Sequence, residues 1–326
     1  MITFAAFARV LTAGVLLAIA GLAAAQQDYP NRPIRFITAY AAGGSTTIVA
    51  RLIGQKLTES WGQQLIVDNR PGGNGFIGGE ALVKAAPDGY TIMLAASTHF
   101  LTPLLLKAPY DPIKDFAPVA TIGKGELVLL LNPSMPGNNL KEFIAYARSR
   151  PGELNYATPG AGGPQHMAHE LLNLLGGIKT LHIPYKGASL ALTDLLGGQV
   201  QMFFSTAVTA IPHVNSGRLK AIAITGTKRM PALAKVPTFA EAGLPEVSKI
   251  GSHFGILAPA GTPKPIIDKL SAEVAKHLAA PAFQEKVIAN GLEPFISTPE
   301  QYAALIKEGL ATNADIIKRA NIKIEQ

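Results

Sequence analysis

The chain has 326 residues, of which 48% are hydrophobic and 16% charged, a composition typical of a globular protein and not of a disordered one. It contains no cysteine, which excludes thiol catalysis, disulfides and cysteine-bound zinc. The 29 Lys and Arg residues outnumber the 22 Asp and Glu residues, but they are scattered and only one Trp is present. This pattern is weak for nucleic-acid binding and suits the attraction of small anions, so we expect no nucleic-acid partner.

Residues 1–25 have the features of a secretory signal peptide. Arg9 is the only charge before residue 28, an apolar run covers residues 10–22, and an alanine triplet follows. The run is short for a transmembrane span, which makes a retained membrane anchor the weaker alternative. We expect cleavage between Ala25 and Gln26 and a mature protein that is soluble outside the cytoplasm.

After the signal peptide, strand-like and helix-like segments alternate along the chain. The strand-like segments are β-branched and nearly all apolar, which indicates parallel sheets covered by helices on both faces. Strands are predicted at 34–40, 65–69, 91–96, 126–132, 154–158, 180–183, 200–205, 219–225 and 254–258. Helices are predicted at 46–60, 78–86, 140–150, 165–175 and 189–196.

The chain after residue 262 has a different pattern, with three successive helices predicted at 265–278, 281–289 and 299–320. No low-complexity linker separates domains. A chain that crosses between two lobes near residues 122–126 and returns near 249–253 needs no such linker. The expected fold is therefore α/β with two lobes, parallel-rich sheets and a helical C-terminal tail. Lobe 1 is expected to hold residues 26–123 and 253–326, and lobe 2 residues 124–252.

Two glycine-rich turns each lead into a predicted helix. In the first, Gly43 and Gly44 follow a strand, and Ser45, Thr46 and Thr47 open the helix. Hydroxyl groups at a helix start can cap its free N–H groups, and those N–H groups and the helix dipole favour an anion. The second turn, residues 158–164, precedes a helix near residue 165. Two such turns predict two lobes that each present backbone donors to one acidic ligand.

Two motifs that resemble cofactor or metal sites lack their usual context, and the motifs of two classes of enzyme are missing. Residues 73–78 match GxGxxG, but no acidic residue for a ribose ends the following strand, so a loop lining a cleft is favoured over nucleotide binding. His166 and His169 precede Glu170 without an identifiable third ligand, so we expect no metal, with His166 facing the cleft and His169 facing solvent or core. No GxSxG motif and no paired carboxylates are present. We expect no catalysis and no cofactor.

The remaining candidate site residues follow strand ends, because ligands bind at the carboxyl edge of open α/β sheets. A histidine at the presumed return crossing, His253, offers an imidazole to a carboxylate. The predicted ligand-binding residues are Tyr40, Ala41, Gly43, Gly44, Ser45, Thr46, Ser97, Thr98, His99, Thr158, Gly160, Ala161, Gly162, Gly163, His166, Ser205, Thr206 and His253.

The whole chain after the signal peptide resembles the periplasmic substrate-binding proteins of tripartite tricarboxylate transporters, the Bug family. The blocks that carry the resemblance are 29–34 (YPNRPI), 43–46 (GGST), 67–72 (VDNRPG), 86–91 (APDGYT), 184–187 (PYKG), 197–200 (GGQV) and 258–263 (APAGTP). The resemblance implies a Venus-flytrap fold, similar to type II binding proteins, whose lobes close over a carboxylate. It also implies that both glycine turns line the ligand and that the partners are a large and a small membrane subunit.

This chain departs from the family pattern at several positions. The family usually has Asp where Thr47 stands, a Pro-rich entry where residues 40–42 stand, a small residue at His169 and an aromatic one at His253. Loss of the acidic residue and gain of imidazoles favour a dicarboxylate or an aromatic carboxylate over an amino acid.

The sequence thus predicts a monomeric periplasmic solute-binding protein that captures an organic carboxylate and delivers it to a tripartite tricarboxylate transporter. Two alternatives remain open. An exported hydrolase acting on a carboxylic acid derivative would turn its ligand over, and a ligand-binding subunit of a sensor system would look identical in sequence.

Overall fold

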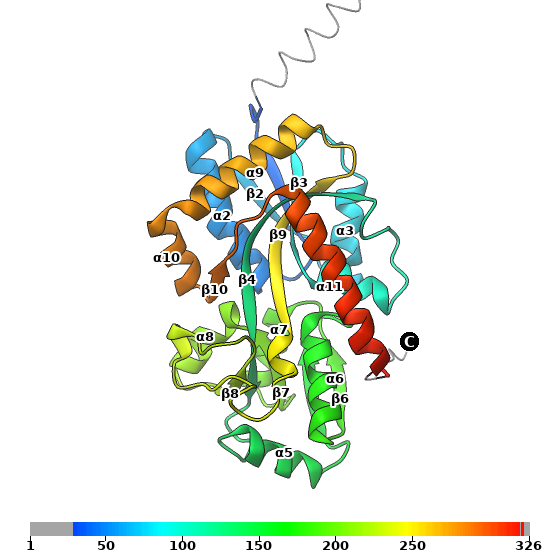
Figure 1. Cartoon of the computed structure of the whole chain (residues 1–326), viewed down its shortest axis with the longest axis vertical. Helices are drawn as coiled ribbons and strands as arrows, with labels where there is room; N and C mark the ends of the chain where they lie inside the picture. The colour runs from blue at the N-terminus through cyan, green and yellow to red at the C-terminus, as the bar shows by residue number, and fades with distance from the viewer. Residues whose placement is uncertain (1–28, 320, 323–326) are drawn as a thin grey trace, which may run out of the picture.

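The computed structural model describes residues 29–319 and 321–322, and the predicted signal peptide and its cleavage site lie outside this part. Two α/β lobes lie one above the other, joined by long strands (Figure 1). The strands, most of which are labelled in Figure 1, are β1 (Ile34–Thr38), β2 (Leu65–Asn69), β3 (Thr91–Ala96), β4 (Phe116–Leu131), β5 (Leu154–Thr158), β6 (Thr180–Pro184), β7 (Met202–Thr206), β8 (Lys220–Ile224), β9 (Gly251–Pro259) and β10 (Leu292–Pro294). The helices are α2 (Ser45–Trp61), α3 (Phe76–Val83), α4 (Thr98–Leu101), α5 (Leu140–Arg148), α6 (Pro164–Gly176), α7 (Ala188–Leu196), α8 (Ala207–Asn215), α9 (Lys264–Ala279), α10 (Pro281–Ala289) and α11 (Pro299–Arg319).

Each lobe is built on a three-stranded parallel sheet. In lobe 1, β1 pairs in parallel with β2 and β3, and in lobe 2, β5 pairs in parallel with β6 and β7. These are the parallel sheets that the apolar strands predicted. The two remaining long strands, β4 and β9, run antiparallel to each other, and β9 also runs antiparallel to β3.

Strand β4 belongs to both lobes. Its first part pairs with β9 as far as Glu126, opposite Gly251, and from Leu127 onward it pairs with β7 and β8 of lobe 2. The chain therefore enters lobe 2 along β4 and returns along β9. Below, lobe 1 means the sheet β2-β1-β3-β9 with the first part of β4, and lobe 2 means the sheet of β5–β8 with the end of β4.

Helix α11 is a third connection between the lobes. Tyr302, 1% exposed, and Ile306 are buried in a cluster of lobe 1, whereas Ile316 and Ile322 at the other end pack against a core of lobe 2. Arg319 also forms an ion pair with Glu246 of lobe 2, with 2.8 Å between Nη2 and Oε2. The helix runs diagonally past β4 and β9 in Figure 1.

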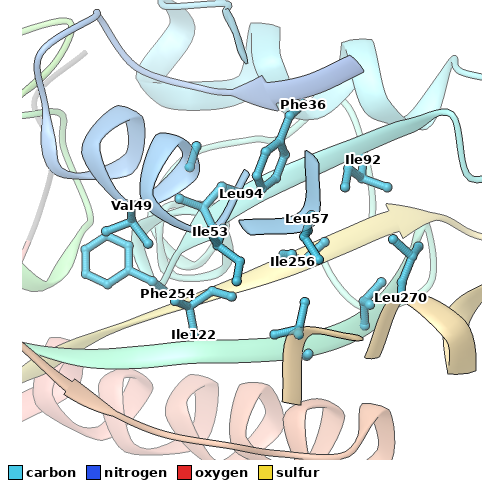
Figure 2. Packing of buried hydrophobic residues seen from close by; sticks show 14 of the residues in the cluster. Phe36, Val49, Ile53, Leu57, Ile92, Leu94, Ile122, Phe254, Ile256 and Leu270 are labelled. Carbon is cyan, nitrogen blue, oxygen red and sulfur yellow. The ribbon is translucent and has the colours of Figure 1, made fainter. Parts of the chain in front are cut away.

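The core of lobe 1 lies between its sheet and α2 and α9. Ile53 and Leu57 of α2 belong to one hydrophobic cluster (Figure 2). The same cluster contains Phe36 of β1, Ile256 of β9 and Leu270 of α9. All five side chains have an exposed fraction of 0%. This packing fixes the direction of α2 and hence the position of its N-terminus at the gap between the lobes.

The GxGxxG match at residues 73–78 has a packing role. The backbone of Gly78 lies so close to Ala39 that a Cβ atom at residue 78 would come within 2.7 Å of the Cα of Ala39. Gly75 has a positive φ of 93° and lies against the hydroxyl of Tyr40. Glycines here let α3 approach the turn after β1.

The sequence did not predict the helices α4 and α8 or the full length of β4. It also did not predict β10 and its pairing with β4. Residues 207–215 form α8 although Pro212 lies within it. Within residues 29–319 and 321–322, no helix is long and apolar enough to cross a membrane.

Replacing Ile53 by alanine tests the packing of α2. We expect Ile53→Ala to lower the free energy of unfolding by about 2–5 kcal/mol, because it removes a fully buried side chain and leaves a cavity. Ile66→Ala is the matched control, because Ile66 is 52% exposed on β2 and its truncation is expected to cost less than about 0.5 kcal/mol. Denaturant unfolding measures both, and equal losses would contradict the assignment of Ile53 to the core.

Candidate functional site

A small cavity of about 20 Å³ lies where the two lobes meet. That volume is enough for about one water-sized group. Both lobes contribute to it: α2, β3 and β9 from lobe 1, and α6, α7 and the end of β7 from lobe 2. The lining residues are Tyr40, Gly44, Ser45, Thr46, Ala96, Thr98, Pro159, Gln165, Ala188, Thr206 and Ser252.

Four helices begin at this cavity. Gly44, Gly163, Gly187 and Thr206 are the N-cap residues of α2, α6, α7 and α8, and none of the four forms a side-chain capping hydrogen bond. The prediction that Ser45, Thr46 or Thr47 would cap α2 is therefore wrong, because the helix starts at the first hydroxyl residue and a glycine occupies the cap. Uncapped N-termini leave backbone N–H donors and positive dipole ends directed at one place.

Three buried side chains around the cavity have a polar atom without a partner among the described residues. These atoms are the hydroxyl oxygen of Tyr40, Oγ1 of Thr46 and Oε1 of Gln165. The three residues are only 7%, 2% and 5% exposed. Leaving a buried polar atom without a hydrogen bond costs about 1–3 kcal/mol. A ligand that pairs with all three atoms at once removes this cost.

The cavity has no charged side chain among its lining residues in the described part of the chain. Burial also raises the pKa of the Tyr40 phenol well above its usual value, which keeps this hydroxyl protonated and able to donate. An anion here would be held by neutral hydroxyl and backbone donors together with helix dipoles.

The side chain of Asn69 fixes the turn that leads into α2. Its Nδ2 lies 2.6 Å from Oγ1 of Thr38, 2.7 Å from Oγ1 of Thr47 and 3.0 Å from the carbonyl oxygen of Tyr40. Thr47, the position where the family pattern has Asp, is thus directed toward β2 and away from the cavity. Asn69 holds the end of β1 and the first turn of α2 in one arrangement.

Small residues allow the lobes to touch beside the cavity. The N–H of Ala41 donates to the carbonyl of Lys186 at 3.2 Å, and the N–H of Ala161 donates to Oδ1 of Asn74 at 3.0 Å. A Cβ atom at Gly163 would lie 2.7 Å from Cγ2 of Thr98. The contact at Gly163 therefore leaves no room for a side chain, not even the methyl group of alanine.

Lobe 2 contains a stack of buried aromatic rings behind the second glycine turn. Ring centroids of His166 and His182 are 4.2 Å apart, as are those of Tyr156 and His169. Nδ1 of His166 accepts the N–H of Gly162 at 3.2 Å, and Nε2 of His169 accepts the N–H of Phe204 at 3.1 Å. Because accepting nitrogens are unprotonated, both bonds require neutral imidazoles, and the stack supports the turn in that state.

The structure brings six of the predicted ligand-binding residues to the cavity and places six more at the lobe contact beside it. Those at the cavity are Tyr40, Gly44, Ser45, Thr46, Thr98 and Thr206. Those at the lobe contact or in the two turns are Ala41, Gly43, Gly160, Ala161, Gly162 and Gly163.

The other six predicted residues have different surroundings. His99 is 1% exposed in an aromatic cluster, where its ring stacks on Tyr110. Its position three residues past Ala96 turns it into the core of lobe 1. Ser205 hydrogen-bonds Thr209, and Thr158 donates to the carbonyl of Gly160 within its own turn. His166 lies in the ring stack described above, so it supports the second turn and does not line the cavity.

Ser97 and His253 line a second cavity, of about 560 Å³, beside the strands β4 and β9. Along β9, Ser252 faces the cavity between the lobes and His253 faces this second one. Helix α11 covers it, with Tyr302 and Arg319 among its walls. Charges of both signs line it, including Lys124, which pairs with Glu126 at 3.1 Å.

The sequence reasoning missed five cavity residues: Ala96, Pro159, Gln165, Ala188 and Ser252. Gln165 and Ala188 carried a usable signal, because each lies in the first turn of a helix that follows a glycine turn. Ala96 and Ser252 face the cavity because neighbouring strands place them there, which no local pattern indicates.

Gly163→Ala tests the lobe contact, because the backbone of Gly163 (φ −82°) suits any residue and only the added methyl group causes a clash with Thr98. We expect a cost of about 1–3 kcal/mol against closure. The variant should show a larger radius of gyration in X-ray scattering without loss of secondary structure. Gly309→Ala, where nothing lies within 4 Å of the added Cβ, is the control. An unchanged radius in Gly163→Ala would contradict the closed contact.

The histidine stack predicts a loss of stability in acid. Burial lowers the pKa of His182 from 6.5 to about 4. Below pH 6.5 His182 takes up a proton in the unfolded chain but not in the folded chain. The contribution of neutral His182 to the free energy of unfolding is therefore complete above pH 6.5 and is lost as the pH falls toward 4. The loss is at most about 1.4 kcal/mol per pH unit. His182→Gln should therefore make the unfolding free energy depend less steeply on pH between 6.5 and 4, and an identical pH profile would contradict this.

Comparisons with known proteins agree with this geometry. The family model "Tripartite tricarboxylate transporter family receptor" matches residues 49–322. Protein BugT of Bordetella pertussis is 36% identical over 317 residues, covering 96% of this chain and 97% of that protein. The structure of Rpa4515 of R. palustris with adipate has a TM-score of 0.88 at 32% identity, covering 90% of this chain and 99% of that one.

MatC of Rhodopseudomonas palustris with bound malate has a TM-score of 0.83 at 33% identity, covering 89% of this chain and 100% of that one. The fold is the two-lobed α/β fold of the periplasmic binding proteins, as predicted. Members of the matched family are binding receptors and not enzymes. The chain belongs to the tripartite tricarboxylate transporter receptor family.

Proposed function

We propose that this protein binds an organic carboxylate in the periplasm and delivers it to the membrane subunits of a tripartite tricarboxylate transporter. The observation that carries the proposal is the cavity between the lobes, where uncapped helix N-termini and three unpartnered polar atoms meet without any charged side chain. A carboxylate supplies acceptors for these donors, and the positive ends of the helix dipoles favour its negative charge.

Relatives with bound ligands support a carboxylate. Adipate is bound by Rpa4515 and malate by MatC, and both are dicarboxylates. Among the described residues, none that lines the cavity is acidic and could pair with the ammonium group of an amino acid. We therefore favour a dicarboxylate or an aromatic carboxylate as the ligand, bound by a monomer.

The mechanism we propose is closure around the ligand. Thr46 belongs to lobe 1 and Gln165 to lobe 2, so a ligand contacts both only when the lobes are together. Such a ligand favours the closed arrangement by its additional contacts there. The cavity of about 20 Å³ is smaller than a four-carbon diacid, so the ligand-bound lobes would stand slightly farther apart than those described here.

The domain boundaries proposed from the sequence fit this mechanism. Motion would bend β4 near Glu126 and β9 near Gly251, where the pairing of β4 changes from lobe 1 to lobe 2. Export by cleavage after Ala25 remains a prediction, tested by the N-terminal mass of the protein recovered from the periplasm.

A thermal-shift screen against aliphatic and aromatic mono-, di- and tricarboxylates tests the function. A ligand at a hundred times its dissociation constant is expected to add about 2.7 kcal/mol of stability. Recovery of the ligand unchanged would agree with a receptor. Its chemical conversion, or binding of sugars or amino acids in place of acids, would contradict the proposal.

The double variant Ser45→Ala/Thr46→Ala tests the contribution of α2 to the site. We expect carboxylate affinity about tenfold weaker, because the buried hydroxyl of Thr46 and its neighbour are removed while the helix remains. The control Ser149→Ala/Thr227→Ala removes the same two groups from exposed positions. Calorimetric titration of both proteins measures the difference, and equal affinities would exclude these hydroxyls from the site.

A further inference from the structure

Gln165 differs in one respect from the other polar side chains at the cavity between the lobes, which are all hydroxyls. Hydroxyl groups and backbone N–H groups can all donate to a carboxylate. The side-chain oxygen Oε1 of Gln165 can only accept, and it is buried without a partner among the described residues. A carboxylate alone satisfies the donors of this site and leaves that oxygen unpaired.

The two lobes contribute matching positions to the cavity. Thr46 is the second residue of α2, and Gln165 is the second residue of α6. Both helices begin directly after a pair of glycines. Both side chains are almost fully buried, and Oγ1 of Thr46 and Oε1 of Gln165 have no hydrogen-bond partner among the described residues. The difference is that Thr46 can donate as well as accept, whereas the amide of Gln165 always presents one oxygen.

In the orientation that the structure gives, Oε1 is the amide atom that is buried without a hydrogen bond to the described residues. There it needs a donor from the ligand, because a buried acceptor without a hydrogen bond is unfavourable.

The donor on the ligand is a hydroxyl and not an ammonium group. Four uncapped helix N-termini direct positive dipole ends at the cavity, and no acidic side chain lines it within the described residues. A cation placed there would be repelled. A neutral hydroxyl pairs with Oε1 of Gln165 without that cost.

We propose that Gln165 is a specificity-determining residue that selects hydroxycarboxylates over carboxylates of the same carbon skeleton without the hydroxyl. This inference rests on the proposed function, because it concerns the same site. A hydroxyl near the bound carboxylate donates to Oε1 of Gln165, while the carboxylate accepts from the first turns of α2 and α6.

Matched pairs of acids test the inference by calorimetric titration of the purified protein: lactate with propionate, malate with succinate, and citrate with tricarballylate. In the pair that binds most tightly, we expect the hydroxy acid to bind about tenfold more tightly than its partner, since the partner leaves a buried oxygen unpaired. Gln165→Met, which keeps the length of the side chain and removes both polar atoms, should reduce the ratio to about twofold or less.

Gln55→Met is the matched control, because Gln55 is exposed on α2 and the same chemical change there should leave the ratio as in the wild type. Circular dichroism shows whether each variant folds, and the wild-type ratios test the inference even if one does not. Equal binding within each pair by the wild type, or an unchanged ratio in a folded Gln165→Met protein, would overturn this inference alone. Failure of every acid to bind would overturn the proposed function and this inference with it.

Discussion

The meeting of uncapped helix N-termini between the lobes is the constraint on which the rest of the structure depends. Helices α2 and α6 begin after glycine pairs, and no side chain caps either one. Bringing positive dipole ends of two lobes together is unfavourable unless something negative lies between them. On the proposed function, an anion bound between the lobes would remove this cost, and closure of the lobes would then follow from binding of the ligand.

The framework around this site is arranged so that the lobes can approach closely and still separate. Glycine and alanine at the contact, such as Gly163 against Thr98, bring the backbones together with few side chains to disengage. Strand β4 runs through both lobes, β9 begins at Gly251 on the boundary between them, and α11 crosses the same boundary outside both strands (Figure 1). Because Arg319 and Ile322 attach the end of α11 to lobe 2, opening the lobes must either carry this end along or detach it.

The sequence predicted what depends on local patterns and missed what depends on packing between distant segments. Apolar strands and glycine turns predicted the parallel sheets and the start of α2 to within one residue. The predicted cap was wrong although serine is a better N-cap residue than glycine by type, because α2 already begins at Ser45 and leaves Gly44 in the cap position. His99 was expected at the site because it follows a strand, but α4 turns it into the aromatic cluster with Tyr110. Gln165 could have been found from its place after a glycine turn, whereas Ser252 needed the pairing of β9 with its neighbours.

The crystal structure of the complex with the tightest-binding carboxylate tests the central claim most directly. The account predicts a carboxylate group within hydrogen-bond distance of backbone N–H groups in the first turns of both α2 and α6, with Thr46 and Gln165 in contact with the ligand. A ligand in the larger cavity beneath α11, or one that contacts a single lobe, would contradict it.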